Sequence, residues 1–342
     1  MKAAVLYGKE DVKVETVAIP KVGPFDVLVR VKAALTCGTD VKVFRRGYHA
    51  RMIVPPAVFG HELAGDIVSV GERVTRFKKG DRVVAGNSAP CGDCFFCQRD
   101  LENLCEDLLF NNGAYAEFIR IPGRIVEKNL YKIPAYVDYQ DAALVEPLAC
   151  VLRGIEESNV RAGDTVVVIG LGPIGLMFVR MAKVLGAKVI AIARREAQLE
   201  NAKRMGAAHL ICLPETEDPV GFVRGLTDGR GADIVIEAVG KPEVWNLSVQ
   251  LLRKGGTVNF FGGCPNETQV ELDTNLLHYS ELTCKASFHH TPRLVKKALD
   301  AVAQGQICAR DFVTDQAPLS SLKDVLRRLM NSSGRLKTAI IP

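Results

Sequence analysis

The stretch TVVVIGLGPIG, residues 165–175, decides the fold of the second half of the chain. It is a short apolar strand pattern followed by Gly170, Gly172 and Gly175 in the spacing GxGxxG. This spacing alone is a weak signal, but a strand before it and a helix after it are the context of a dinucleotide-binding turn. Gly170 permits the tight turn, Gly172 lets the backbone approach a pyrophosphate, and Gly175 lets the helix pack on the strand.

The helix that follows begins near Pro173 and Ile174. Its first N–H groups are free and carry a partial positive charge, which favours the phosphates of a dinucleotide. A tight strand–helix turn without a ligand is the alternative. Outward from this point, apolar strand patterns alternate with helical patterns, which is typical of a doubly wound parallel sheet. The expected strands are residues 165–170, 187–193, 207–213, 233–240, 255–262 and 282–288.

The residue that ends the second of these strands distinguishes NAD from NADP. An acidic residue there would hydrogen-bond the ribose 2′-hydroxyl of NAD. Ala193 occupies this place, and Arg194 and Arg195 follow it. Two guanidinium groups without a carboxylate offer a site for a 2′-phosphate, so the sequence favours NADP, with NAD as second choice. Two solvated arginines at the start of a helix are the alternative.

The first part of the chain indicates a barrel-like β domain, because its strand patterns are short and separated by Gly and Pro. A helical pattern follows at residues 138–158. After about His290 the chain alternates between helix and strand again, and we place this tail on the first domain. The expected domains are residues 1–150 with 290–342, and residues 151–289. The strands expected in the first part are residues 2–7, 27–35, 64–71 and 81–86.

Four cysteines crowd the stretch CGDCFFCQRDLENLC in the pattern CxxCxxCx7C. Thiolates are soft ligands, and their number and spacing predict a closed tetrahedral zinc site that holds shape rather than performs chemistry. A disulfide pair is the alternative. The predicted ligands are Cys91, Cys94, Cys97 and Cys105.

Composition narrows the class of protein. The net charge of +5 over 342 residues is too small to argue for nucleic acid. No signal-peptide pattern and no apolar stretch of membrane-spanning length occur, so we expect a cytoplasmic protein without membrane contact. The remaining cysteines apart from Cys37 are expected to be small buried hydrophobic residues. They are Cys150, Cys212, Cys264, Cys284 and Cys308.

A second, dispersed set of metal-ligating residues consists of Cys37 in LTCGTD and His61 and Glu62 in VFGHELAGD. A thiolate, an imidazole and nearby carboxylates build a catalytic zinc site if one coordination position stays open. From spacing alone, a buried free cysteine and a capping histidine explain the pattern equally well.

The run GHELAGDIVSVGERVTRFKKGDRVVAG resembles the signature of the zinc-containing medium-chain alcohol dehydrogenases. The cysteine loop and then GxGxxG follow in the order usual for that family, and the resemblance covers essentially the whole chain. The GHE form and the run Glu146-Pro147-Leu148-Ala149 look most like the sorbitol, or polyol, branch. Threonine dehydrogenases are similar but less alike at the latter run.

The resemblance implies a GroES-like catalytic domain, a Rossmann domain and a role for each matching residue. Cys37 and His61 match two ligands of a catalytic zinc, and Glu62 matches a carboxylate beside it. Glu146 matches a further acid that binds the metal directly or through water. Thr39 matches a hydroxyl that passes the alcohol proton towards solvent.

The resemblance is weaker at the outer end of that proton relay, where Lys42 stands in place of the histidine of many relatives. Tyr48 or His49 would have to substitute, and Tyr48 is also a candidate for substrate contact. His289 and His290 fall where relatives place a polar residue on the substrate side, although both could instead be surface residues capping the following helix. Two loops are expected at the nicotinamide end, Glu237 to Gly240, which includes Val239, and Phe261 with Gly262. Ordinary turns at strand ends are the alternative.

The sequence therefore predicts a dehydrogenase with two zinc ions per chain that transfers hydride between a small secondary alcohol, a polyol or sugar derivative, and NADP. Its active site would lie in the cleft between the domains. An L-threonine or simple-alcohol dehydrogenase is one alternative, and a non-catalytic dinucleotide-binding protein is another. Because relatives form dimers or tetramers, a homo-oligomer is expected.

Overall fold

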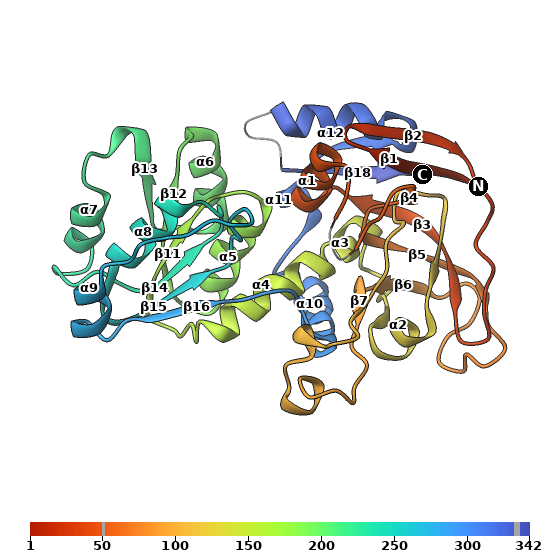
Figure 1. Ribbon diagram of the computed structural model, residues 1–342, viewed down its shortest axis with the longest axis horizontal. Coiled ribbons are helices and arrows are strands. Elements are labelled where there is room, and N and C mark those ends of the chain that lie inside the picture. Colours follow the sequence, from red (N-terminus) through yellow and green to blue (C-terminus); the bar gives the residue numbers. More distant parts are fainter. Residues whose placement is uncertain (50–51, 332–335) are drawn as a thin grey trace. The chain divides into compact units, whose positions relative to one another are not determined.

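The structure is a computed structural model that describes residues 1–49, 52–331 and 336–342. The chain divides into two compact units. The first unit consists of Met1–Ala149 with His290–Pro342, and the second consists of Cys150–His289. In Figure 1 the first unit therefore takes both ends of the colour scale, and the second takes the green and cyan middle.

The second unit is built on a parallel six-stranded sheet. Its strands are β11 (Thr165–Ile169), β12 (Lys188–Ala193), β13 (His209–Cys212), β14 (Ala232–Glu237), β15 (Leu252–Phe260) and β16 (Thr283–Ala286). They lie in the order β13-β12-β11-β14-β15-β16. The order reverses between β11 and β14, and in such sheets ligands bind beyond the carboxyl ends of the strands at the point of reversal.

The helices of the second unit alternate with these strands. The sheet is covered because its central strands are apolar on both faces, as with Val166, Val167 and Val168, which are fully buried. The connecting elements are α5 (Pro173–Val184), α6 (Glu196–Met205), the 3-10 turn η3 (Leu213–Glu215), α7 (Pro219–Gly225), α8 (Pro242–Gln250) and α9 (Thr274–Tyr279).

The first unit is mostly antiparallel. Its strands are β1 (Lys2–Gly8), β2 (Asp11–Thr16), β3 (Val27–Leu35), β4 (Ala57–Val58), β5 (Glu62–Val70), β6 (Arg82–Ala85), β7 (Ser88–Ala89), β8 (Leu109–Phe110), β9 (Phe118–Ile121), β10 (Leu130–Lys132), β17 (Val313–Pro318) and β18 (Lys337–Ile341). The largest sheet runs β10-β6-β5-β3-β18-β17, with β9 also paired to β3, and smaller sheets are β2-β1-β4 and β7-β8. Together the two units confirm the expected fold class.

The tail of the chain completes the sheet of the first unit. Strand β18 pairs antiparallel with β3, with Ala339 opposite Leu35, and parallel with β17. Two segments about 300 residues apart in sequence are therefore neighbours.

The helices of the first unit are α1 (Gly38–Arg46), α2 (Gly123–Lys128), α3 (Tyr139–Ala143), α10 (Pro292–Ala303), α11 (Ala309–Phe312) and α12 (Leu322–Asn331). Helix α4 (Val145–Glu157) begins in the first unit and ends in the second. The first unit also has the 3-10 turns η1 (Cys97–Arg99), η2 (Glu102–Leu104) and η4 (Leu319–Ser321).

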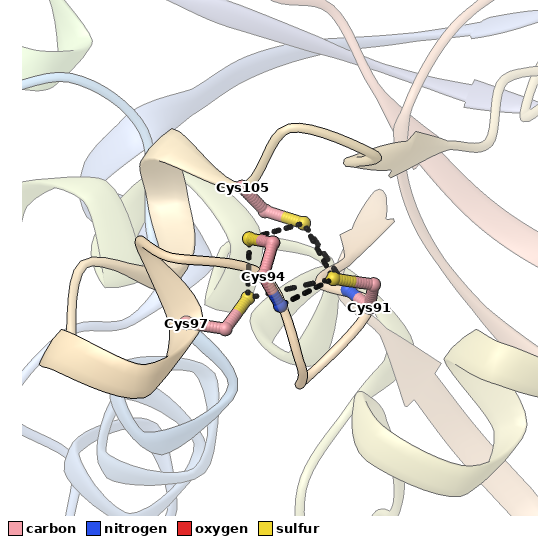
Figure 2. Close-up of side chains that lie close together, drawn as sticks. All are labelled: Cys91, Cys94, Cys97 and Cys105. Atoms are coloured by element: carbon pink, nitrogen blue, oxygen red, sulfur yellow. Dashed lines mark hydrogen bonds between the residues drawn. The ribbon is translucent and has the colours of Figure 1, made fainter.

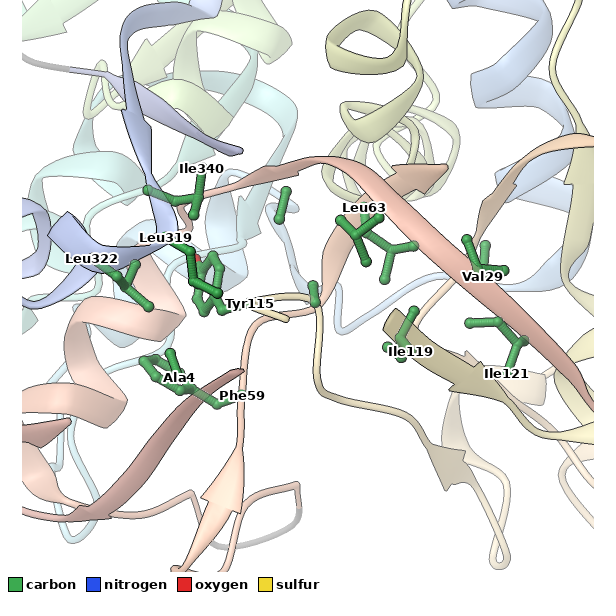
Figure 3. Close-up of a cluster of buried hydrophobic side chains, with 14 of the residues drawn as sticks. Ala4, Val29, Phe59, Leu63, Tyr115, Ile119, Ile121, Leu319, Leu322 and Ile340 are labelled. Atoms are coloured by element: carbon green, nitrogen blue, oxygen red, sulfur yellow. The ribbon is translucent and has the colours of Figure 1, made fainter. Parts of the chain in front are cut away.

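The core of the first unit gathers around Tyr115, which is fully buried and packs edge-on against Phe59 with ring centroids 5.1 Å apart (Figure 3). Gly60 follows Phe59 with a φ of +91°, a conformation that L side chains rarely adopt. A Cβ at Gly60 would come within 2.6 Å of the Tyr115 ring. Glycine is therefore required where the chain enters β5 and presents the two residues that follow.

Two details differ from the sequence-based expectations. The helical pattern at residues 138–158 forms two helices, α3 and α4, with the break at Leu144. The burial of the scattered cysteines was predicted wrongly, since Cys284 is exposed and the other four are half-buried. Among the described residues, every helix falls short of the length and apolarity that crossing a bilayer requires.

Helix α12 offers a test of how the tail stabilises the first unit. Leu322, Val325 and Leu326 are at most 1% exposed and share one helix face. Leu326→Ala should lower the free energy of unfolding by about 2–5 kcal/mol, because it leaves a cavity in the core. Urea unfolding followed by circular dichroism measures this change. Arg327→Ala, on the exposed face, should stay within about 0.5 kcal/mol of wild type. Equal effects of the two substitutions would contradict the packing described.

Candidate metal and dinucleotide sites

Cys37 is held at the start of α1 by a reciprocal cap. Its Sγ accepts a hydrogen bond from the backbone N–H of Thr39 at 3.4 Å, and its own N–H donates to Asp40 Oδ2 at 2.9 Å. This is the geometry of a capping box, with a thiol in place of the usual hydroxyl. The side chain is half-buried, and the cap at the start of α1 helps to fix its position.

Glu62 is the first residue of β5, and His61 precedes it directly after the turn at Gly60. One ligand atom each from Cys37, His61 and Glu62 lie within 4.8 Å of one another. His61 is 5% exposed and Glu62 is fully buried. The structure thus brings together three residues that the sequence places on two separate segments.

Asp40 orients the imidazole of His61. Its Oδ2 also accepts a hydrogen bond from the Tyr115 hydroxyl at 2.5 Å, and its Oδ1 lies 3.3 Å from His61 Nδ1. Burial is the largest single influence and would lower the pKa of His61, but the charge and hydrogen bonding of Asp40 and Cys37 together raise this pKa well above its usual value. Since Nδ1 faces Asp40, Nε2 is the nitrogen left for a metal, and a proton on His61 would compete with that metal.

Glu62 forms a buried ion pair with Lys337, the first residue of β18. Lys337 Nζ lies 2.7 Å from Oε1 and 2.6 Å from Oε2, and it also donates to the backbone oxygen of Thr36 at 3.0 Å. Burial alone would lower the pKa of Lys337, yet the charge of Glu62 raises it, so the ammonium stays charged. Each carboxylate oxygen of Glu62 keeps a further lone pair. The ion pair with Lys337 therefore holds Glu62 beside Cys37 and His61 and leaves its oxygens able to bind a metal.

These residues fit a zinc ion. A thiolate, an imidazole and a carboxylate are the donors of a three-ligand site with an open fourth position. His61 Nδ1 and Asp40 Oδ1 are buried and form no hydrogen bond in the described part of the chain, although they face each other. In metal sites the second nitrogen of a ligand histidine usually donates its N–H to a carboxylate or another acceptor. His61 Nδ1 and Asp40 Oδ1 are placed to form this hydrogen bond when Nε2 binds an ion.

Glu146 lies in the first turn of α4 and is 5% exposed. Burial raises the pKa of Glu146 to about 7, against a lowering influence of His61. His290 Nε2 lies 3.6 Å from Glu146 Oε1 and 3.0 Å from Asn87 Oδ1. His290 and Asn87 are both buried, so the surface alternative is wrong for His290.

The other residues predicted for the proton relay and the substrate are less enclosed. Thr39 is half-buried on the first turn of α1, and Lys42 is exposed one turn later. Tyr48 is 57% exposed, and His49 exchanges backbone hydrogen bonds with Ile53. His289 belongs to the second unit and has a φ of +64°.

The four cysteines of the loop face one another, as Figure 2 shows. Their Sγ atoms are separated by 3.4 Å for Cys91–Cys105, 3.5 Å for Cys94–Cys97, and 3.9 Å for both Cys91–Cys97 and Cys94–Cys105. A tetrahedral zinc with Zn–S bonds of the usual length has sulfur–sulfur edges of about 3.8 Å. The backbone N–H groups of Cys97 and Glu106 lower the pKa of Cys94 to about 6. All four are free thiols in the structure, and the donor set fits one closed zinc site.

The GxGxxG turn of the second unit connects β11 to α5. Gly170 has a φ of +94°, and a Cβ at Gly175 would lie 1.8 Å from the backbone oxygen of Gly170. Gly172 is the N-cap of α5 and a Cβ there would meet nothing within 4 Å, so this face is open. Pro173 and Ile174 begin the helix. The close packing and the open face suit a backbone that receives a pyrophosphate.

The remaining residues predicted for the coenzyme lie at strand ends of the same sheet. Ala193 is the last residue of β12, and the exposed Arg194 and Arg195 lead into α6, with Arg195 as its N-cap. Val239 and Gly240 follow β14. Phe261 and Gly262 follow β15, and the Phe261 ring meets that of Phe178 edge-on at 4.9 Å.

Sequence reasoning missed three residues of the metal site. Asp40 had a local signal, since an acid at the third position after Cys37 is the partner expected of a cap. Asn87 sits between β6 and β7 without any motif. Lys337 is 275 residues from Glu62 and contacts it only because β18 pairs with β3.

Two family profiles match the chain. A profile described as "Zinc-binding dehydrogenase" matches residues 173–304, and one described as "Alcohol dehydrogenase GroES-like domain" matches residues 23–135. The second span contains Cys37, His61 and the cysteine loop, and the first begins within the dinucleotide turn.

Similar proteins match over nearly their whole length. Sorbitol dehydrogenase of Bacillus subtilis is 31% identical, with 100% of this chain and 97% of the relative covered. L-threonine 3-dehydrogenase of Bacillus licheniformis is 34% identical, with 98% and 96% covered. A solved structure described as a zinc-binding dehydrogenase of Sinorhizobium meliloti bound to NADP has a TM-score of 0.90 at 32% identity, with 100% and 99% covered.

The Lys337–Glu62 pair can be tested by removing one charge. Lys337→Met should lower the free energy of unfolding by about 3–5 kcal/mol, because it leaves a buried carboxylate without a partner. The double variant Glu62→Gln with Lys337→Met should be more stable than Lys337→Met alone. Urea unfolding of the three proteins measures both effects. A Lys337→Met protein that unfolds at the wild-type urea concentration would show that the pair contributes nothing.

Proposed function

Because the chain belongs to the zinc-containing medium-chain alcohol dehydrogenase family, we propose that it transfers hydride between a secondary alcohol and NADP. The observation that carries the proposal is the group of Cys37, His61 and Glu62, whose ligand atoms lie within 4.8 Å of one another. In this proposal the first unit binds the alcohol and the second unit binds the coenzyme.

Each residue of the first unit has a distinct part in the proposed reaction. Zinc, when bound, supplies a Lewis acid that lowers the pKa of the alcohol hydroxyl. Cys37 and His61 hold it, and Asp40 keeps the imidazole in the orientation that directs Nε2 towards it. The Thr39 hydroxyl takes the proton of the alcohol and, being half-buried, passes it to solvent.

Glu62 and Glu146 complete the metal surroundings in this proposal. Glu62 remains beside the ion because Lys337 neutralises its charge, and Glu146 binds the ion directly or through water. The cysteine loop holds a second zinc with a structural role, which its sulfur–sulfur distances support. Two zinc ions per chain follow from these assignments.

The preference for NADP rests on the end of β12. Ala193 carries no carboxylate that would repel a 2′-phosphate, and the exposed Arg194 and Arg195 are free to bind it. A solved structure bound to NADP at 32% identity supports the same choice. NAD remains the second choice.

A polyol or sugar derivative is the substrate class we propose. Asn87, His290 and Glu146 form a buried polar cluster in the first unit, which would bond additional hydroxyls better than an alkyl chain. The alternatives are L-threonine and a simple alcohol, and relatives named for sorbitol and for L-threonine are about equally similar. Sorbitol, xylitol, L-threonine and 2-propanol, each with NADP and NAD, distinguish these substrates by reduced-nicotinamide absorbance. A non-catalytic role is disfavoured because every residue of the proposed reaction is present.

We also propose a homo-oligomer, a dimer or tetramer, in the cytoplasm. Strand β16 is the exposed edge of the sheet of the second unit, and all four of its residues are exposed, so its backbone is available for pairing. The ten cysteines are all described and all are free thiols, as in a reducing compartment.

Replacing Cys37 tests the proposed reaction. Cys37→Ser should lower kcat by about 100-fold or more, since loss of a mere outer partner of a metal already costs about 10–100-fold. Zinc analysis should fall from near two ions per chain to near one, while NADP binding by calorimetry stays unchanged. Cys284→Ser, at an exposed cysteine, is the matched control and should behave as wild type. Retained turnover in Cys37→Ser would reject the metal assignment.

Replacing Ala193 tests the coenzyme assignment. Ala193→Asp should move the ratio of kcat/KM for NADP to that for NAD at least about tenfold towards NAD, because a carboxylate repels the 2′-phosphate and bonds the 2′-hydroxyl. Steady-state kinetics with both coenzymes measure the ratio. An unchanged ratio would show that the end of β12 does not read the 2′ position.

A further inference from the structure

Glu237 is a buried carboxylate at the carboxyl end of β14. Its residue is fully buried, and its Oε1 accepts hydrogen bonds from the backbone N–H groups of Val239 at 2.7 Å and Gly240 at 2.8 Å. The side chain therefore folds back over its own chain. It fixes the loop that follows β14, in which Gly240 has a φ of +78°.

The backbone of the same residue fixes a second loop. The backbone oxygen of Glu237 accepts hydrogen bonds from the N–H groups of Phe261 at 3.0 Å and Gly262 at 2.8 Å. A Cβ at Gly262 would lie 2.4 Å from the nitrogen of Gly240 and 2.7 Å from Glu237 Oε2. The loops after β14 and β15 are thus in close contact, with Glu237 between them.

The loop after β14 also contacts the dinucleotide turn. The N–H of Ala238 donates to the backbone oxygen of Ile169 at 2.8 Å. A Cβ at Gly170 would lie 2.5 Å from Val239 Cγ2. Val239 therefore packs closely against the first glycine of the GxGxxG turn, so three strand ends are in contact around one carboxylate.

The second oxygen of Glu237 makes this carboxylate costly to bury. Oε2 is buried and has no hydrogen-bond partner in the described part of the second unit. The nearby indole N–H of Trp245 donates instead to the Gly262 oxygen at 3.2 Å, while the Trp245 ring stacks on Phe260 at 4.0 Å. Burial raises the pKa of Glu237, against the lowering effect of the surrounding N–H groups. An apolar residue would avoid the cost of burying Oε2 without a partner. We therefore attribute the carboxylate to the backbone N–H groups of Val239 and Gly240, which Oε1 holds in place.

We propose that Glu237 is a positioning residue for the nicotinamide half of the coenzyme. It holds the loops at 238–240 and 261–262 in the arrangement that receives the nicotinamide, and it acts by accepting backbone hydrogen bonds rather than by touching the reacting atoms. This inference rests on the proposed function, since it presumes that the second unit binds a dinucleotide.

The test compares a whole coenzyme with its adenine half. Glu237→Ala removes the acceptor of two backbone N–H groups, so the Kd for NADP should rise at least tenfold by calorimetry. The Kd for adenosine 2′,5′-bisphosphate, which lacks the nicotinamide, should stay within twofold. Glu237→Gln keeps a carbonyl oxygen as acceptor and should restore NADP binding to within about threefold of wild type. Glu243→Gln, whose side chain is 68% exposed, is the matched control and should behave as wild type.

Two results with Glu237→Ala would overturn the inference. One is a Kd for NADP within twofold of wild type, and the other is an equal loss of affinity for NADP and for adenosine 2′,5′-bisphosphate. If Glu237→Ala does not fold, Glu237→Met decides, because it fills the space of the side chain but accepts no hydrogen bond from Val239 or Gly240. A rise of at least about threefold in the Kd for NADP alone then supports the inference, and no rise overturns it. Wild-type protein that binds neither nucleotide would reject the proposed function itself.

Discussion

The first unit depends on the buried ion pair between Lys337 and Glu62. A carboxylate with no exposure to water needs a partner, and the nearest ammonium arrives from the other end of the chain. Lys337 reaches Glu62 when β18 lies between β3 and β17. The pairing of β3 with β5, which sets Leu35 opposite Glu62, brings Glu62 close to Cys37. The same sheet therefore assembles the metal ligands and supplies the ammonium that neutralises Glu62.

The candidate sites of both units are built at the ends of helices and strands. Cys37 caps α1, Glu62 begins β5, Gly170 follows β11, and Glu237 ends β14. At such ends the backbone has N–H and C=O groups without partners inside the element. Side chains can take those groups as fixed hydrogen-bond partners, as Asp40 and Glu237 do. The functional side chains are thus positioned by the unpaired backbone groups that occur at every helix or strand end.

Local patterns predicted much of this structure, and contacts between distant segments account for what they missed. The cysteine loop and the GxGxxG turn lie within short stretches, so their spacing carries the geometry. Lys337 carries no motif, and its burial follows from strand pairing across about 300 residues. Asn87 reaches His290 from 203 residues away. The exposure of Cys284 follows from an unpaired sheet edge that composition does not reveal. The break at Leu144 lies inside one continuous apolar periodicity.

The return of the tail to the first unit has a consequence for biosynthesis. A ribosome makes the whole of the second unit, residues 150–289, before it makes the strand that finishes the first. The second unit can fold while Lys337 is still inside the ribosomal exit tunnel. Until residue 337 emerges, Glu62 of the amino-terminal segment lacks the ammonium with which it pairs in the folded protein. During that interval the nascent amino-terminal half is a natural client for chaperones, and premature termination shortly before residue 337 would yield a chain that cellular quality control removes.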